Sequence, residues 1–362
     1  DGEGIGNTMN IEYLREQIDS LDTEIVRLLN ERIGVVLKIG EEKKKHGGEI
    51  YVPSRERQVF EKIKKLNGGP LPDESAHAIY REIMSAALAL EAEMKIAYLG
   101  PEATFTHQAA RNKFGTSVEY VPAGSIGEVF DRVQNRTVDY GVVPIENSIE
   151  GAVTNTFDQF AVTSTKICAE IYLPISLTLL SRYSKKEVRL IYSKQEVFGQ
   201  CRGWLHGNMP NVELVAVEST GKAVQMALET PGAAAIASAM TSDLYEIEVL
   251  ATNIQDIQGN TTRFLVIGQN YGPATGTDKT SIVFGVKHKV GALYDALSVF
   301  KTDRINMSKI ESRPSKNKAW EYVFFVDIDG HADDPAVARA LEDLQEHCTN
   351  MTVLGSYPQA EA

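Results

Sequence analysis

The sequence predicts a multidomain protein, with an all-α domain, an α/β domain and an α+β domain in that order. Its 362 residues exceed the roughly 100–200 residues typical of one domain. Apolar residues recur at helical spacing up to residue 94, and beyond it short apolar runs alternate with helical segments. A third pattern of strands and helices follows a Gly- and Thr-rich linker at residues 271–278. We therefore place the domains at residues 9–94, 95–270 and 279–358.

Composition argues against several classes of function. A hydrophobic content of 43% with 24% charged residues is typical of a globular protein, and no apolar stretch is long enough to cross a membrane. The formal net charge of -12 opposes nucleic-acid binding. Three widely spaced cysteines fit a reducing compartment, and the histidines show no metal-ligand spacing. Residues 1–10 lack a signal peptide, so we expect a cytoplasmic protein. Whether the residues before Met9 are native stays open.

The first domain begins with one long predicted helix. Apolar residues recur three and four positions apart, as in a coiled-coil seam. The seam residues are Ile11, Leu14, Ile18, Leu21, Ile25, Leu28, Val35 and Ile39. A helix over residues 11–43 would be about 50 Å long, which is longer than a small domain is wide. The simplest way to bury its apolar face is an interwoven homodimer.

Two cations lie on the same face of this helix. Arg32 occupies a seam position where an aliphatic residue is expected, and Lys43 follows close to three helical turns later. A cation on a buried stripe is costly unless an anion meets it. The anion is either a buried Glu or a bound ligand, and two cations facing one space favour the ligand.

Two shorter helices complete the first domain. Ser54 stands in an N-cap position before a helix that runs to about Leu66, and Gly47-Gly48 separates this helix from the first. A third helix is predicted over residues 73–93. Its apolar stripe consists of Ile79, Ile83, Ala87 and Leu90.

Strands and helices alternate in the second domain, which is typical of an α/β fold. A strand at residues 96–99 is followed by a helix at residues 105–114. Further apolar runs fit a mostly buried sheet, at residues 140–145, 167–180, 188–192, 212–217, 233–237 and 264–267.

Polar residues adjoin three of these runs. The stretch 259–264 places hydroxyls, an amide and a guanidinium just before the last run. Residues 146–151 follow an earlier strand, and Ser193 and Gln200 follow another. Polar loops fixed by strand ends are where α/β proteins bind ligands. We therefore expect these segments to converge on one cleft.

The third domain is predicted to have the order βαββαβ, which is that of an α+β ferredoxin-like fold. Helices are expected at residues 291–301 and 334–347, and strands at residues 280–286, 306–312 and 320–328. One face of the last strand carries Trp320, Tyr322, Phe324, Val326 and Ile328.

The first domain resembles the helical chorismate mutase family over its whole length. The motifs are Tyr13-Leu14-Arg15, Asn30-Glu31-Arg32, Lys43, Arg55-Glu56-Arg57 and residues 81–91. The resemblance implies a concerted rearrangement of chorismate to prephenate, for which the protein supplies shape and charge. Val52 and Ala87 depart from residues common in that family.

The same resemblance implies a role for each site residue. Arg32 and, from the second subunit, Arg15 hold the two substrate carboxylates. Lys43 and Glu91 face the ether oxygen, and Glu91 is useful there only as the protonated acid. Glu56 takes the ring hydroxyl, and Arg55 supports the site.

The second domain resembles prephenate dehydratases in four segments that stand in the family order. They are residues 98–106, Pro144-Ile145-Glu146-Asn147-Ser148, residues 193–200 and Thr262-Arg263-Phe264. The resemblance implies two lobes around a cleft, as in periplasmic solute-binding proteins. It also implies a reaction in which prephenate loses CO2 and water to give phenylpyruvate.

By this resemblance Thr262 donates to the leaving hydroxyl, while Asn147, Ser193 and Gln200 fix the substrate. Thr104 lies in the first motif and is a further substrate contact. Arg263 either contacts substrate or forms a structural salt bridge. A threonine hydroxyl is a poor acid, so its use requires a dry, closed site.

The third domain resembles the ACT regulatory domain of dehydratases, through Gly291-Ala292-Leu293 and Glu311-Ser312-Arg313-Pro314. The resemblance implies that L-phenylalanine binds between these two segments, across a dimer interface. The alternative is a plain ferredoxin-like accessory domain.

These resemblances cover nearly the whole chain. They imply a bifunctional cytoplasmic enzyme of phenylalanine biosynthesis that is feedback-inhibited by L-phenylalanine, forms a homodimer or higher oligomer, and uses neither metal nor cofactor. Two alternatives stay open: arogenate, the transaminated analogue, as the dehydratase substrate, and a non-catalytic amino-acid sensor. The presence of Thr262, Ser193 and the mutase cations in one chain argues against the sensor.

Overall fold

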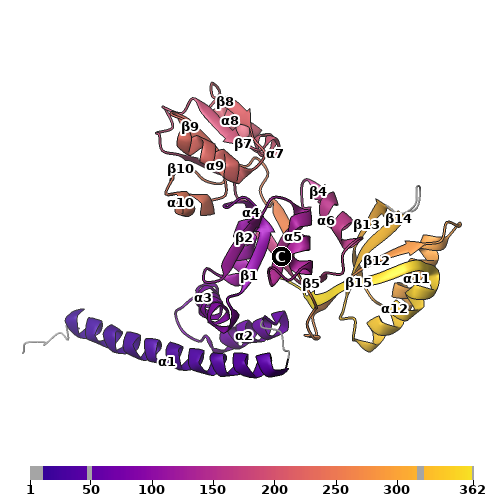
Figure 1. Ribbon diagram of the computed structural model, residues 1–362. Helices are drawn as coiled ribbons and strands as arrows, with labels where there is room; N and C mark the ends of the chain where they lie inside the picture. The colour runs from indigo at the N-terminus through magenta and orange to yellow at the C-terminus, as the bar shows by residue number, and fades with distance from the viewer. Residues whose placement is uncertain (1–10, 47–50, 316–321, 361–362) are drawn as a thin grey trace, which may run out of the picture.

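A computed structural model describes residues 11–46, 51–315 and 322–360 and confirms the three fold types (Figure 1). A helical domain, drawn in indigo, is followed by an α/β domain of two lobes and by a C-terminal domain drawn in orange and yellow. The first lobe of the α/β domain shares apolar clusters with both other domains. Among the residues that the structure describes, none of the helices is both long enough and apolar enough to cross a membrane.

The helical domain contains α1 (Ile11–His46), α2 (Pro53–Leu66) and α3 (Asp73–Ala92). The long helix α1 extends well past the other two (Figure 1), and Gly40 is the one residue within its bounds that is buried. The predicted seam is therefore uncovered within one chain. Leu21 is 63% exposed and Ile25 is 52% exposed.

The predicted N-cap of α2 is wrong by two residues. Val52 is the cap, Pro53 is the first helical residue, and Ser54 lies buried inside the first turn. Proline suits the first position because its missing N–H would have no helical partner there. The predicted break at Gly47-Gly48 lies outside the described residues.

The first lobe is built on a sheet with the strand order β2-β1-β3-β11-β5, to which β4 is added beside β3. Its strands are β1 (Lys95–Leu99), β2 (Glu119–Ala123), β3 (Tyr140–Asn147), β4 (Gly151–Ala152), β5 (Lys166–Pro174) and β11 (Thr261–Gly268). Its helices are α4 (Phe105–Phe114), α5 (Ile126–Gln134) and α6 (Thr154–Phe160).

The second lobe has the strand order β10-β6-β9-β7-β8. Its strands are β6 (Thr178–Ser181), β7 (Leu190–Ser193), β8 (Glu213–Ala216), β9 (Ala233–Ala237) and β10 (Glu248–Ala251). Its helices are α7 (Gln195–Gln200), α8 (Arg202–Asn208), α9 (Thr220–Glu229) and α10 (Met240–Tyr245). The predicted single run at residues 167–180 is in fact two strands in two sheets, β5 and β6. The chain passes between the lobes there and returns before β11.

Strand β11 is the returning segment and pairs on both sides, with β3 and with β5. Its register sets Thr262 opposite Asn147 and Arg263 opposite Glu146. Because side chains alternate along a strand, Thr262 and Arg263 point to opposite faces of the sheet.

The C-terminal domain has the predicted βαββαβ order and the strand order β13-β14-β12-β15. Its elements are β12 (Asp278–Val286), α11 (Ala292–Thr302), β13 (Met307–Pro314), β14 (Tyr322–Asp329), α12 (Pro335–His347) and β15 (Cys348–Pro358). Phe324, Val326 and Ile328 pack in the cluster beneath the helices, as their predicted shared face requires. Trp320 lies outside the described residues.

The other face of this sheet packs on the first lobe. Val283, Phe325 and Tyr357 share one apolar cluster with Ile145 and Leu265 of the lobe. The backbones approach closely where Gly355 of β15 passes Ile167, since a methyl group on Gly355 would lie 2.1 Å from the Ile167 carbonyl oxygen.

We predict that Gly355→Ala destabilises this domain contact. A side chain there must displace backbone, and such overpacking typically lowers the free energy of unfolding by about 1–3 kcal/mol. Chemical denaturation of the purified variant measures the change. Gly272→Ala is the matched control, because its added methyl has no neighbour closer than 3.8 Å. Equal denaturation midpoints for the two variants would contradict the predicted close approach.

Candidate active sites

A cavity of about 950 Å³ lies between the two lobes. Four of the predicted site residues line it: Thr104, Asn147, Gln200 and Thr262. The expected convergence of polar strand ends on one cleft is therefore present for these residues. Ser193 and Arg263 are not among the lining residues.

Asn147 holds the hydroxyl of Thr262 in one orientation. Its Oδ1 accepts hydrogen bonds from the backbone N–H groups of Ile149 at 2.9 Å and Glu150 at 3.0 Å. The Nδ2 group must then face the other way, where it donates to Thr262 Oγ1 and to Asn260 Oδ1, both at 2.8 Å. Because Thr262 Oγ1 accepts from Asn147, its own O–H is left to donate.

The chain of amide hydrogen bonds continues across the cleft through Gln200, which was a predicted site residue, and through Asn260 and Glu150, which were not. Asn260 Nδ2 donates to Gln200 Oε1 at 3.2 Å, and Gln200 Nε2 donates to Glu150 Oε1 at 2.8 Å. Gln200 belongs to α7 of the second lobe, whereas Asn260 and Glu150 belong to the first. This chain of hydrogen bonds therefore links the lobes beside Thr262.

Ser193 lies at the end of β7 with its side chain turned away from the cleft. The residue is fully buried, and its hydroxyl donates to the carbonyl oxygen of Ile236 in the neighbouring strand at 2.8 Å. The hydroxyl is therefore used between strands, and a substrate contact of Ser193 stays a prediction.

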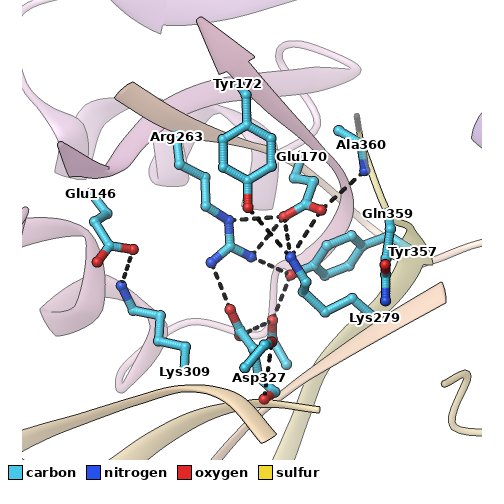
Figure 2. Close-up of polar contacts among 12 residues, drawn as sticks. Glu146, Glu170, Tyr172, Arg263, Lys279, Lys309, Asp327, Tyr357, Gln359 and Ala360 are labelled. Atoms are coloured by element: carbon cyan, nitrogen blue, oxygen red, sulfur yellow. Dashed lines mark hydrogen bonds and ion pairs between the residues drawn. The ribbon is translucent and has the colours of Figure 1, made fainter. Parts of the chain in front are cut away.

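Of the two roles predicted for Arg263, the structure shows the structural salt bridge. Its guanidinium donates to Glu170 Oε2 at 2.8 Å, Asp327 Oδ2 at 2.6 Å and Tyr357 Oη at 3.0 Å. Burial lowers the pKa of Arg263, but Tyr357, Asp327 and Glu170 outweigh burial and raise it. The guanidinium is a charged partner of Asp327 and Tyr357 in the C-terminal domain (Figure 2). Because side chains alternate along β11, it lies on the sheet face opposite Thr262.

The N-terminal turns of three helices border the cleft. Thr104, Ser125 and Ser219 cap α4, α5 and α9, each accepting a backbone N–H with its hydroxyl. Helix N-termini carry partial positive charge and favour anions. Lys194 and Lys222 also line the cavity, together with Glu150, Glu196 and Glu218.

A neutral histidine fixes the loop that carries Thr104. The backbone N–H of Ala103 donates to His107 Nδ1 at 3.2 Å. Burial is the main cause that lowers the pKa of His107 to about 4, so the ring stays neutral and able to accept this hydrogen bond near pH 7. Tyr98 stacks on the ring at 4.5 Å between centroids.

The helical domain brings Lys43 and Glu91 together, as the sequence predicts. Lys43 Nζ lies 3.4 Å from Glu91 Oε1. This oxygen is buried and has no hydrogen-bond partner in the described chain, and the same is true of Arg32 Nη1. Gly40 allows the approach, because a methyl group on it would lie 2.6 Å from Glu91 Cγ.

Glu56 contacts a residue from another domain that the sequence did not predict. Its carboxylate accepts from Tyr51 Oη at 2.9 Å and from Lys113 Nζ, which comes from α4 of the α/β domain. Arg55 and Arg15 are exposed. Arg15 lies about 25 Å along α1 from Arg32, at 1.5 Å rise per residue, so one chain does not bring these two arginines together.

A smaller cavity of about 290 Å³ adjoins the start of α11. Gly291, Ala292 and Leu293 line it, and so does Phe324, the cross-strand partner of Ser312. Glu311 and Arg313 flank Ser312 and alternate to the other face of β13. Within one chain, the two predicted effector segments are therefore not fully brought together.

No group of three His, Cys, Asp or Glu residues arranged to hold a metal ion occurs within the described ranges 11–46, 51–315 and 322–360.

Comparisons with known proteins match the three domains in order. Family models match as chorismate mutase type II over residues 14–92, prephenate dehydratase over residues 96–271 and ACT domain over residues 280–346. The bifunctional chorismate mutase/prephenate dehydratase of Aquifex aeolicus is 52% identical over 355 residues, which is 97% of this chain and 98% of the relative. That of Neisseria gonorrhoeae is 42% identical and covers 96% of each chain.

One solved structure is similar to most of this chain. The prephenate dehydratase of Arthrobacter aurescens, in complex with L-Phe, has a TM-score of 0.69 and 32% sequence identity to this chain. The match covers 74% of this chain and 90% of that one.

We predict that Gly40→Ala impairs the rearrangement of chorismate. The new methyl would displace the Glu91 side chain from Lys43, and loss of one oriented polar group typically slows such a reaction about 100-fold. Steady-state assays with chorismate and separately with prephenate measure the effect, and only the first should change. Gly34→Ala lies on the same helix with no atom near its added methyl. If the two variants rearrange chorismate equally well, Gly40 does not set the position of Glu91.

Proposed function

The chain belongs to the bifunctional chorismate mutase/prephenate dehydratase family, and on that premise we propose which residues carry each reaction and how two chains assemble around them. The helical domain rearranges chorismate to prephenate. The cleft of the α/β domain then converts prephenate to phenylpyruvate, CO2 and water. The hydrogen bond from Asn147 Nδ2 to Thr262 Oγ1 carries the second assignment, because it leaves the Thr262 hydroxyl hydrogen available to donate.

The mutase site is formed around Lys43, Glu91 and Arg32. The rearrangement breaks a C–O bond and forms a C–C bond in one step, so it needs no nucleophile. Negative charge develops on the ether oxygen, and Lys43, which lies beside Glu91, is the charged donor placed for it. Preorganised donors in a buried site stabilise such charge without reorganising. Arg32, whose buried Nη1 has no hydrogen-bond partner in the described chain, receives a substrate carboxylate.

The second carboxylate requires a second chain. Arg15 stands too far along α1 to reach a substrate held by Arg32 of the same chain, and the apolar seam of α1 is exposed throughout. An antiparallel partner helix would cover the seam and bring its own Arg15 to Arg32. The protein is then a homodimer with two shared mutase sites.

Prephenate binds in the cleft with its two carboxylates near the helix N-termini. Arg263 is turned away, so the capped ends of α4, α5 and α9 with Lys194 and Lys222 supply the positive field. The electrons of the C–CO2 bond enter the ring as the C–O bond of the hydroxyl breaks. Thr262 donates its hydrogen to that departing oxygen, which leaves as water, and a proton from solvent restores the Thr262 hydroxyl when the cleft opens.

Asn147 and Gln200 act through other groups in this scheme. Asn147 orients the Thr262 hydroxyl, and all of its own amide groups are used. Gln200 joins the lobes, so closure of the cleft on substrate draws α7 towards Thr262 and excludes water, as a weak donor requires.

L-Phenylalanine is the proposed effector, and the cavity beside Gly291-Ala292-Leu293 is its proposed site. The relative from Arthrobacter aurescens was solved with L-Phe. Glu311, Ser312 and Arg313 would close this site from a second ACT domain, since β13 is an edge strand of its sheet.

We predict that Thr262→Val lowers the dehydratase kcat about 100-fold or more, the usual scale for a lost donor or acid. Valine keeps the shape of threonine, so KM for prephenate should change little and the mutase rate should not change. Phenylpyruvate formation from prephenate measures the effect. The control is Thr261→Val, because Thr261 is the adjacent residue and does not line the cavity. Wild-type phenylpyruvate formation by Thr262→Val would remove Thr262 from the mechanism.

Mixing two inactive variants tests the shared mutase site. Arg15→Ala and Lys43→Ala should each lose mutase activity as homodimers. After subunit exchange, about half of the dimers are mixed and each holds one intact site, so up to roughly one quarter of wild-type activity should return. A site completed within one chain would give no recovery at all, and that outcome would overturn the proposed dimer.

A further inference from the structure

The catalytic strands present two successive pairs of side chains, one to each side of the sheet. Thr262 and Asn147 are paired across β11 and β3 and adjoin the cleft, and Arg263 and Glu146 form the next pair. The second pair faces the ACT domain, where Arg263 contacts Asp327 and Glu146 contacts Lys309 (Figure 2).

The ACT residues are themselves a cross-strand pair. Lys309 of β13 lies opposite Asp327 of β14. One pair from the ACT sheet therefore meets one pair from the dehydratase sheet through two ion pairs of opposite polarity. Reversed polarity fixes both the register and the orientation of the contact, because a shift by one strand would place like charges together.

We propose that Lys309 and Asp327 are positioning residues for the dehydratase reaction and the route by which ACT occupancy reaches the cleft. They hold Arg263 and Glu146, which are the chain neighbours of Thr262 and Asn147. This inference rests on the proposed function, since it takes Thr262 as the donor and phenylalanine as the effector.

The Arg263 side of the contact is rigid. Arg263 is 7% exposed and Glu170 is fully buried, and Lys279 Nζ lies within 3.0 Å of both Glu170 oxygens. Ser281 Oγ donates to Asp327 Oδ1 at 2.6 Å. Separating any of these charges would leave a buried charge unpaired, so Arg263 moves with Asp327.

The Lys309 side is adjustable. The Lys309 side chain is 14% exposed and that of Glu146 is 41% exposed, so the Glu146 carboxylate can turn to water when this pair breaks, while Lys309 stays largely covered. The pairing of β11 with β3 also changes register directly after Arg263, and such irregularities re-aim neighbouring side chains. A small displacement of β13 can therefore tilt the Glu146 pair, and with it Asn147 and the Thr262 hydroxyl.

Strand β13 also carries the effector segment. Glu311 and Arg313 lie two and four residues beyond Lys309 on the same face of the strand. Arg313 Nη2 lies 3.6 Å from Asp158 Oδ1 of α6, which is a second contact with the dehydratase domain. An effector bound to this segment is thus a few residues away from the contact with Glu146.

The test compares catalysis, inhibition and effector binding in the full-length protein. In Lys309→Met, we expect dehydratase kcat to change with little change in KM for prephenate. The phenylalanine concentration for half-inhibition should rise about tenfold, within the usual range of allosteric coupling. Phenylalanine affinity, measured by calorimetry, should stay within about threefold of wild type by the same coupling argument. Lys309→Arg should restore inhibition, because it keeps the charge.

The charge-swapped variant Lys309→Glu/Glu146→Lys tests whether the ion pair matters or only the lysine at position 309. It should recover the phenylalanine inhibition that each single substitution loses. Lys95→Met is the control, because Lys95 pairs with Glu119 on the same sheet far from the ACT contact. Wild-type inhibition in Lys309→Met overturns the inference, and so does a loss of phenylalanine affinity as large as the loss of inhibition. A wild-type protein that forms no phenylpyruvate from prephenate would instead refute the proposed function.

Discussion

The alternation of side chains along β11 is the constraint on which the arrangement of this protein depends. Thr262 and Arg263 are chain neighbours, yet the two-residue period of a strand sends one to the cleft and the other to the ACT domain. The strand is held on both sides, by β3 and by β5. One short segment therefore belongs to the catalytic site and to the regulatory contact at once.

The buried charges behind β11 define how the two domains meet. Arg263 and Lys279 balance Glu170 and Asp327, so the cluster is neutral as a whole. Replacing such a cluster by apolar residues is often neutral or stabilising. Its contribution here is therefore to fix the orientation of the two domains and not to add stability. Apolar packing around Phe325 and Tyr357 would tolerate many orientations, whereas these ion pairs are satisfied in one.

Periodicity and composition predicted the local structure well and the long-range contacts poorly. The helix at residues 105–114 and the βαββαβ order follow from local patterns, and the structure has them. The run at residues 167–180 looked continuous because both β5 and β6 are buried, and only the passage between lobes separates them. Arg263, Ser193 and Glu56 have partners 43 or more residues away along the chain, and no sequence pattern records such partners.

The helical domain depends on contacts with the neighbouring lobe, although its sequence motifs all lie within residues 9–94. Tyr51 lies against Phe114 and Tyr140 of the neighbouring lobe, and its carbonyl oxygen accepts from Tyr140 Oη. Met94, at the domain boundary, is almost fully buried in the same cluster. Removing the helical domain from the chain would expose these side chains to solvent and would leave Glu56 without its ion-pair partner Lys113. The first enzyme is thus built partly from contacts with the second. Separating the two into independent proteins would require new surface residues where the helical domain meets the first lobe.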